Sequence, residues 1–220
     1  MFKTIIFVVD GTLIDGTDGI IKSVVKAIKH FNLPMLNDEK LVEFVGPPIQ
    51  NSCKNIYNTD DVFAQDFANY FRKEYSGGDV FFAKVYNGIY ELLECLKSQG
   101  YKLGVATYKR QDYARELMNH FGFDKYFESI CGADNENKLK KIDILKNCMI
   151  ELDAEKSSTI LIGDSYHDGG AAQELGVSFI GVTYGFGFKN QEESVDYNPI
   201  LVANNVHQII DYFTKEKINA

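Results

Sequence analysis

The sequence predicts an α/β protein with a doubly wound parallel sheet and a small all-helical domain inserted after the first strand. Two observations predict this fold. Over most of the chain, short β-branched and aromatic runs alternate with amphipathic stretches at helical spacing. Such alternation produces parallel strands joined by right-handed crossovers, with helices on both faces of the sheet. Between residues 19 and 77 only helical spacing is found, so this block interrupts the alternation.

The first strand is predicted over residues 3–9. This run, KTIIFVV, is rich in β-branched residues and ends at Asp10-Gly11-Thr12. A short apolar run that is closed by a turn signal is typical of a buried parallel strand. We therefore place it at the start of the sheet.

A helical block follows the first strand. Its apolar residues recur at three- and four-residue spacing, and Pro34 stops the first helix. The sequence therefore predicts an α/β core of residues 1–15 and 78–220 and a helical cap of residues 16–77. The apolar positions that set the helical spacing are Ile20, Ile21, Val24, Val25, Ile28 and Phe31.

After Gly77 and Gly78 the alternation of helix and strand resumes. Ligands of doubly wound sheets bind at the carboxyl ends of the strands, so functional residues are expected there. Helices are predicted at residues 88–98, 111–121, 138–150 and 168–175, and each precedes one of the strands predicted at residues 102–106, 128–131, 159–162 and 178–182.

The composition is that of an ordinary globular chain. With 220 residues and 45% hydrophobic content, the chain is able to bury a substantial core, which excludes a disordered or fibrous protein. The apolar run from Ile5 to Val9 is closed by Asp10 and is too short for a signal peptide or a membrane span. A cytoplasmic protein without a membrane partner is therefore expected.

The net charge of −8 and the pI near 5.0 disfavour nucleic acids and anionic membranes as partners. An anionic substrate would need a local positive centre, which a bound metal ion and one or two lysines could supply. The oligomeric state is not indicated by any sequence feature. The four cysteines are widely spaced and are expected to be buried free thiols, namely Cys53, Cys95, Cys131 and Cys148.

Polar residues directly follow three predicted strands, at Asp10, Thr107 and Asp164. Each has an ordinary alternative, because D-G-T is a common turn and an aspartate after a strand often caps the next helix. Their convergence on one sheet edge favours a functional site. Asp168 opens the next helix four residues after Asp164, so one carboxylate could bind a hard cation while the other orients it.

Lys141 is a further candidate for this site. It begins an apolar-periodic segment in the helix before the Asp164 strand. Its alternative is a solvated surface lysine, and the neighbouring Lys138 and Lys140 are not excluded by spacing. Position alone therefore leaves the assignment of the cation open.

Taken together, these motifs resemble the four signature motifs of haloacid dehalogenase-like phosphatases, within the phosphoglycolate-phosphatase-like group. The motifs are FVVDGTLID at residues 7–15, LGVAT at 103–107, KIDIL at 141–145 and GDSYHDGGAA at 163–172. The resemblance extends to VGPPI at residues 45–49, VYNGIYELL at 85–93 and GVTYGFG at 181–187. It implies a Rossmann-like phosphatase core with a small helical cap.

The resemblance implies roles for three catalytic residues. Asp10 would protonate the leaving-group oxygen and later activate water, while its backbone carbonyl would bind Mg²⁺. Thr107 would donate its hydroxyl to a phosphoryl oxygen, and Lys141 would neutralise charge on the phosphoryl group.

A magnesium site and a phosphate cradle are implied as well. Asp164 would ligate Mg²⁺ directly beside the carbonyl of Asp10, and Asp168 would support the metal shell. The backbone amides of Gly11 and Thr12 would help Thr107 and Lys141 to hold the phosphate.

The sequence departs from the family pattern at Val8. The family nucleophile is an aspartate two residues before Asp10, and valine has no lone pair with which to attack phosphorus or bind a cation. Loss of many orders of magnitude in turnover and weaker Mg²⁺ binding are expected. Because Thr107, Lys141 and Asp164 all match, an ancient loss of function is disfavoured. A recent or deliberate substitution, a sequence error and a selected phosphate-binding pseudoenzyme remain open.

The leading functional prediction is a magnesium-dependent phosphomonoesterase that acts on a small phosphorylated metabolite through an aspartyl-phosphate. Its alternatives are a catalytically silent protein that binds phosphate or a phosphoester, and a phosphomutase. A dehalogenase is disfavoured, because it would need neither Mg²⁺ nor a lysine-threonine phosphate cradle. The cap would exclude water and select the substrate. Lys109 and Arg110 either reach a second anionic group of that substrate or lie solvated in a loop.

Overall fold

The structure, a computed structural model, describes residues 2–218. Its centre is a six-stranded parallel sheet in the order β5-β4-β1-β6-β7-β8. In β1, Phe7 is paired with Val105 of β4 and with Ile162 of β6, so the ends of these three strands lie side by side. The strands are β1 (Thr4–Phe7), β4 (Lys102–Arg110), β5 (Ser129–Ala133), β6 (Thr159–Gly163), β7 (Ser178–Val182) and β8 (Leu201–Ala203).

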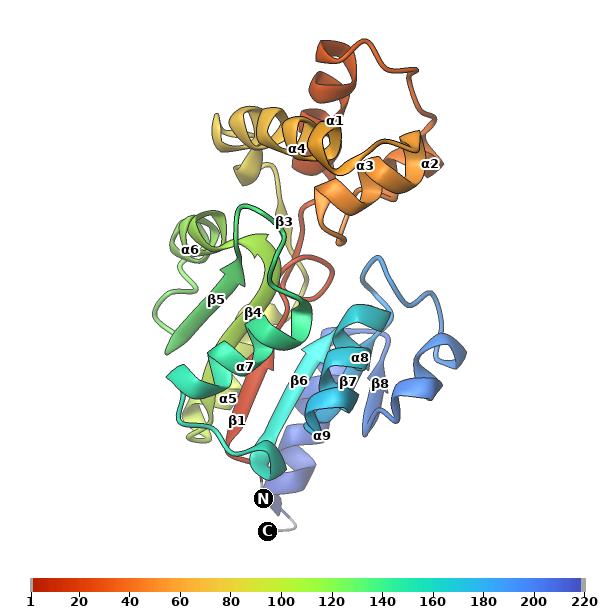
Figure 1. The fold of residues 1–220 in the computed structure, drawn as a ribbon. Coiled ribbons are helices and arrows are strands. Elements are labelled where there is room, and N and C mark those ends of the chain that lie inside the picture. The colour runs from red at the N-terminus through yellow and green to blue at the C-terminus, as the bar shows by residue number, and fades with distance from the viewer. Residues whose placement is uncertain (1, 219–220) are drawn as a thin grey trace.

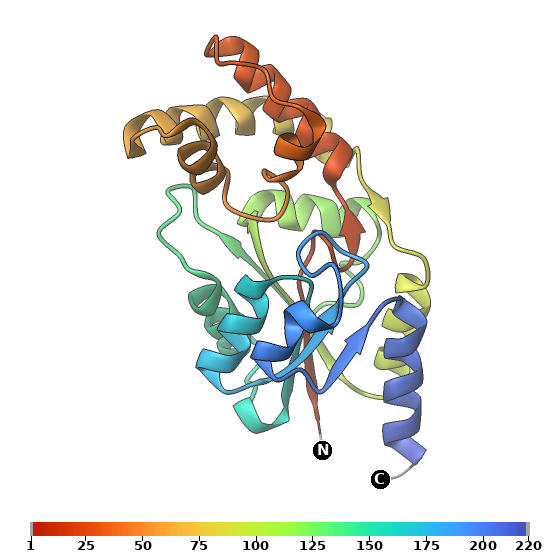
Figure 2. The ribbon, with the colours of Figure 1, turned by 90° about the vertical axis from the view of Figure 1, so that its right-hand side faces the viewer.

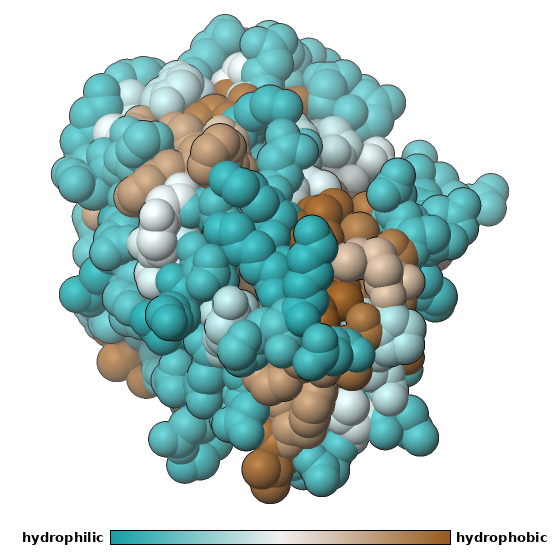
Figure 3. Space-filling model, turned by 90° about the horizontal axis from the view of Figure 1, so that it is seen from above, coloured by the Kyte–Doolittle hydropathy of each residue, from teal (hydrophilic) through white to brown (hydrophobic). Residues whose placement is uncertain are grey.

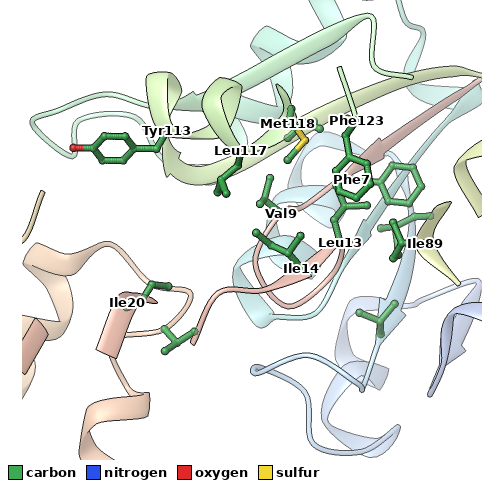
Figure 4. Packing of buried hydrophobic residues seen from close by; sticks show 14 of the residues in the cluster. Phe7, Val9, Leu13, Ile14, Ile20, Ile89, Tyr113, Leu117, Met118 and Phe123 are labelled. Atoms are coloured by element: carbon green, nitrogen blue, oxygen red, sulfur yellow. The ribbon is translucent and has the colours of Figure 1, made fainter. Parts of the chain in front are cut away.

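Helices cover both faces of the sheet (Figures 1 and 2). Alternate residues of β1 and its extension point to opposite faces. Ile6 and Val8 join the core beneath α7 and α8, whereas Phe7 and Val9 join the larger core beneath α5, α6 and α9, where Figure 4 shows Phe7 beside Phe123. The helices are α5 (Ile89–Ser98), α6 (Gln111–His120), α7 (Lys141–Glu151), α8 (Tyr166–Leu175) and α9 (Val206–Ile218).

The helices between residues 17 and 76, here called the cap, lie above the carboxyl ends of the strands (Figure 1). Aromatic residues pack at the centre of the cap, where the Phe31 ring lies 5.1 Å from Phe63 and 5.9 Å from Phe67. Seen from above, the outer surface is mostly hydrophilic (Figure 3). The cap helices are α1 (Thr17–His30), α2 (Asp38–Val42), α3 (Ile49–Tyr57) and α4 (Asp61–Ser76).

The two chain segments that join the cap to the core lie side by side. β2 (Ile14–Asp15) and β3 (Lys84–Val85) form an antiparallel ribbon. Beside the ribbon, the carboxylate of Asp79 accepts a hydrogen bond from Ser23 and forms ion pairs of 2.8 Å with Lys22 and with Lys26. These contacts hold α1 against the segment that leaves α4.

The structure confirms the predicted fold class and departs from the predicted elements in detail. The ribbon, β8 and α9 were not predicted. The ribbon and β8 were missed because strands of two or three residues carry no detectable period. α8 begins at Tyr166, so Asp168 is its third residue rather than its first. β4 continues beyond residue 106 to Arg110, and α7 begins at Lys141 rather than at 138. Within residues 2–218, no helix is long and apolar enough to cross a membrane.

Candidate active site

The loop after β1 brings Asp10 to the sheet edge in a tight turn. The carbonyl of Val9 accepts hydrogen bonds from the amides of Leu13 and Ile14, at 2.9 and 3.1 Å. Gly11 has a φ of +77°, and a Cβ at this position would collide with the carboxylate of Asp164. Glycine is therefore required both for the turn and for the close approach of β6.

The backbone amides of this loop already have partners. Those of Gly11 and Thr12 donate to carbonyls of the same loop at 2.9 and 3.3 Å, so a phosphate would have to compete with these bonds. Thr107 lies buried beyond the pairing of β4 with β1. Its Oγ1 accepts a hydrogen bond from the amide of Lys109 at 3.1 Å, which leaves its own proton free to donate.

Asp10 forms a buried ion pair with Lys109. The Nζ of Lys109 lies 3.1 Å from Oδ2 of Asp10 and donates to the hydroxyl of Tyr75, in cap helix α4, at 2.7 Å. The Lys109 side chain is 4% exposed. Burial opposes its charged form, but the attraction of Asp10 and Tyr75 is larger, so the pKa of Lys109 is raised above its usual range. The Oδ1 of Asp10 is buried without a hydrogen-bond partner among the described residues.

Lys141 and Asp168 form a second buried ion pair. Their atoms Nζ and Oδ1 are 2.8 Å apart, and the side chains are 5% and 2% exposed. The other carboxylate oxygen of Asp168 accepts hydrogen bonds from the amide and hydroxyl of Ser165 at 3.0 and 2.6 Å, in a capping box at the start of α8. One oxygen of Asp168 is thus paired with Lys141, and the other accepts hydrogen bonds at the start of α8. The ion pair holds the ammonium group of Lys141 at the sheet edge.

Asp164 is a buried acid without a cationic partner within ion-pair distance among the described residues. Its Oδ2 accepts hydrogen bonds from the amides of Phe186 and Gly187 at 2.9 and 3.1 Å. Burial raises the pKa of Asp164 to about 7, and repulsion by Asp168 adds to the effect. A cation next to this carboxylate would remove the cost of its charge.

These residues fit a weakly held magnesium ion. No cluster of three or more acidic, histidine or cysteine side chains able to hold a metal occurs within residues 2–218. Mg²⁺, however, is often held by one or two carboxylates, substrate phosphates and water. The carboxylate of Asp164 and the backbone carbonyl of Asp10 would supply such a site, whereas both oxygens of Asp168 are already engaged. Val8 contributes no ligand.

One cavity of about 660 Å³, here called the phosphoryl cavity, joins the predicted side chains. The cap closes part of this cavity through residues around Gly46 and Pro47. The structure therefore brings together residues that lie up to about 160 positions apart in the chain. Val8, at which the sequence departs from the family pattern, lines this cavity. The predicted site residues that line it are Asp10, Thr107, Lys141, Asp164 and Asp168.

A sequence model described as haloacid dehalogenase-like hydrolase matches residues 5–182. The chain belongs to the haloacid dehalogenase-like hydrolases. It is 32% identical over 191 residues to a 5'-nucleotidase of Pseudomonas aeruginosa, covering 86% of each chain, and 27% identical to pyrophosphatase PpaX of Halalkalibacterium halodurans, covering 95% of each. Its structure is similar to that of a predicted phosphatase from Clostridium acetobutylicum, with a TM-score of 0.91, 33% identity, and coverage of 98% and 99%.

By family resemblance the chain is therefore a phosphatase of the haloacid dehalogenase type. Sequence reasoning left the place of Lys109 open and missed Tyr75 and Tyr108. The amide of Lys141 donates to the hydroxyl of Tyr108 at 3.0 Å, so this tyrosine positions the start of α7. Lys109 could have been assigned to the site from its position two residues after Thr107. Tyr75 could not, because nothing in the cap sequence distinguishes it from other buried aromatic residues.

Proposed function

We propose that this haloacid dehalogenase-type scaffold, with its core at residues 1–15 and 78–220 and its cap at 16–77, is a magnesium-dependent phosphomonoesterase for small phosphorylated metabolites. In the chain as it stands, Val8 silences it. The observation that carries the proposal is the convergence of Asp10, Thr107, Lys141 and Asp164 on one cavity. Together these groups offer an acid-base group, a hydroxyl donor, a buried cation and a metal ligand.

We propose the following chemistry for a chain with a carboxylate at position 8. That carboxylate attacks phosphorus and the bond from phosphorus to the leaving oxygen breaks. Asp10, which has to be protonated when the substrate is bound rather than ionised as in its pair with Lys109, gives its proton to that oxygen. Asp10 then takes a proton from a water molecule, whose oxygen attacks phosphorus. The bond from phosphorus to the carboxylate at position 8 breaks, which regenerates that carboxylate and releases inorganic phosphate. Thr107 and Lys141 hold the phosphoryl oxygens through both steps. When bound, Mg²⁺ supplies positive charge that offsets the charge of the phosphoryl group.

Without that carboxylate, no covalent step is available to the chain as given. The remaining groups still favour binding, because Lys141, Thr107 and Asp164 do not depend on Val8 for their hydrogen bonds or ion pairs. We therefore propose that the present chain binds phosphate and compact phosphoesters without appreciable turnover. The substitution Val8→Asp distinguishes the two possibilities. It should restore turnover in an inactivated enzyme, whereas a protein that only binds phosphoesters should remain inactive.

The test compares the given chain with Val8→Asp and with Val8→Asn, which has a similar size but no nucleophile. Magnesium-dependent release of phosphate from acetyl phosphate and from a panel of small phosphomonoesters is measured. We expect Val8→Asp to exceed both other proteins by roughly 10⁶-fold, the scale of removing a covalent nucleophile. If all three fold and bind phosphate but none turns over any substrate, the enzyme proposal fails and the binding role stands.

A further inference from the structure

The segment after β7, residues 184–188, lies between two parts of the site that come from different strands, and we call it the supporting loop. Its sequence is YGFGF, which includes most of the GVTYGFG motif. A Cβ at Gly185 would collide with the carbonyl oxygen of Gly11 and with the carboxylate of Asp164. A Cβ at Gly187 would collide with the backbone carbonyl of Asp164. Glycine thus allows the loop to pack directly against the turn after β1 and against Asp164.

The supporting loop holds both the side chain and the backbone of Asp164. The amides of Phe186 and Gly187 donate to Oδ2 of Asp164 at 2.9 and 3.1 Å. The amide of Phe188 donates to its backbone carbonyl at 2.7 Å. These bonds use only one carboxylate oxygen. Oδ1 of Asp164 accepts no hydrogen bond from the residues that the structure describes, so it is available to a cation.

The supporting loop also holds the turn after β1, through Tyr184. The hydroxyl of Tyr184 donates to the backbone carbonyl of Thr12 at 3.0 Å. The Thr12 side chain provides no such anchor, because its Oγ1 is buried without a hydrogen-bond partner within residues 2–218. The amide of Tyr86 donates to the next carbonyl, that of Leu13, at 3.2 Å, and the ring of Tyr86 packs against that of Tyr184 at a centroid distance of 4.9 Å. Tyr184 therefore joins this turn to the supporting loop.

The pairing of β1 with β6 ends before the two proposed metal ligands. Phe7 is the last residue of β1 in register with Ile162, and the amide of Val8 donates to the carbonyl of Ile162 at 3.0 Å. In the described part of the chain, no hydrogen bond joins Asp10 directly to Asp164. Mg²⁺ demands nearly octahedral geometry with short ligand distances. The separation of the two ligands therefore has to be fixed through another part of the chain.

We propose that Tyr184 is a positioning residue for the proposed magnesium site, because its hydroxyl ties the turn that carries the Asp10 carbonyl to the loop that orients Asp164. This inference rests on the proposed function and adds a residue outside the four signature motifs. The turn is tight, because the carbonyl of Val9 accepts three of its amides. Holding the Thr12 carbonyl therefore also holds the peptide of Asp10. Without the hydroxyl, the two ligands are no longer held relative to each other, and the ion binds more weakly.

The test measures the binding of Mn²⁺ alone, a spectroscopically visible substitute for Mg²⁺, to the unsubstituted chain. Electron paramagnetic resonance reports the free Mn²⁺ directly, so it measures weak binding without turnover. Tyr184→Phe removes the hydroxyl and keeps the ring. We expect it to weaken Mn²⁺ binding by roughly 10-fold, the lower end of the range for residues that support metal ligands. Asp164→Asn should abolish the binding and thereby defines the site.

Tyr57→Phe is the matched control. The hydroxyl of Tyr57 also donates to a backbone carbonyl, that of Pro34, at 2.9 Å, but both residues lie in the cap. This variant should bind Mn²⁺ like the unsubstituted chain. Urea denaturation of both variants separates a loss of stability from a loss of metal binding, because a purely structural role of Tyr184 would lower only the free energy of unfolding.

A second measurement uses the Val8→Asp background. There, Tyr184→Phe should raise the Mg²⁺ concentration that gives half-maximal phosphate release by a similar factor of roughly 10. Saturating Mg²⁺ should restore kcat to nearly that of the protein with Tyr184, because the hydroxyl takes no part in proton or phosphoryl transfer. A kcat that stays low at saturating Mg²⁺ would contradict the positioning role.

The possible outcomes separate this inference from the proposed function. Unchanged Mn²⁺ binding in Tyr184→Phe, or an equal loss in Tyr57→Phe, overturns the positioning role and leaves the proposed enzyme standing if Val8→Asp releases phosphate. If Val8→Asp is inactive while Mn²⁺ binding depends on Asp164 and Tyr184, the proposed enzyme fails and the positioning role stands. If Mn²⁺ binds equally to the unsubstituted chain and to Asp164→Asn, or to neither, the magnesium site and the role of Tyr184 both fail.

Discussion

Two cavities at the edge of the sheet are built in different ways. The phosphoryl cavity takes Asp10, Lys141 and Asp164 from elements of the core, and each is held by partners that also belong to the core or to the adjoining loops. A second, smaller cavity between the cap and the core depends on where α4 lies, because Arg72 and Tyr75 reach it from the cap. The comparison shows that the predicted site residues are placed by the strand ends of the core, whereas the smaller cavity between cap and core also depends on the position of a separate helical domain.

Lys109 is the point at which the two regions meet. It contacts Asp10 in the core and Tyr75 in the cap, at 3.1 and 2.7 Å. The cap is therefore linked to Asp10, the proposed acid-base group, through two short contacts. Substitutions on either side of this link test how independent the two regions are.

The largest effect on stability is expected on the core side. Lys141→Met leaves the buried carboxylate of Asp168 without its cation, so it should lower the free energy of unfolding by about 3–5 kcal/mol. Urea denaturation measures the change. The double variant Lys141→Met with Asp168→Leu removes both charges and should recover much of the loss. A single variant as stable as the parent would show that the pair does not hold this side of the site together.

The pH dependence of stability tests the role of the buried Asp164 on the core side of the site. Its pKa is raised to about 7, so without metal the ionised form costs stability as the pH rises from about 4 to about 7. Asp164→Asn should therefore raise the Tm at pH 8 by at least about 2 °C, and it should abolish the Tm increase that we expect Mg²⁺ to cause in the unsubstituted chain. The exposed change Glu174→Gln is the control. Equal Mg²⁺ responses of the two variants would exclude Asp164 as the ligand.

The smallest effect on stability is expected on the cap side. Tyr75→Phe removes the hydroxyl that accepts from Lys109 and keeps the ring, so it should cost about 1 kcal/mol in unfolding free energy. In the Val8→Asp background it should lower kcat by roughly 10-fold and shift the pH profile of kcat, because Lys109 no longer has its second anchor beside Asp10. Tyr70→Phe, a cap tyrosine stacked on His30, is the control. An unchanged pH profile would separate the cap from the acid-base group.

The difference between the core and the cap also determines how much of the site could be predicted from the sequence. Thr107 and Asp164 directly follow apolar strand runs, so the edge at which they meet could be predicted from the alternation of elements. The pairing of Lys141 with Asp168 could not, because it depends on the packing of α7 beside α8. Tyr75 and Arg72 carried no signal, since the face that α4 presents to the core is set by contacts between domains. The short β2 and β3 are likewise fixed by pairing rather than by composition.

A phosphoryl group bound covalently at position 8 can be detected by mass spectrometry. Val8→Asp combined with Asp10→Asn is mixed with acetyl phosphate and Mg²⁺, quenched in acid and digested. Acetate is a good leaving group that needs little help from an acid, whereas hydrolysis of the intermediate needs the base that Asp10→Asn removes. We expect one phosphoryl group on the peptide that contains position 8, and none in Asp10→Asn with Val8 retained. A phosphoryl group elsewhere, or none in either protein while both bind phosphate, would contradict it.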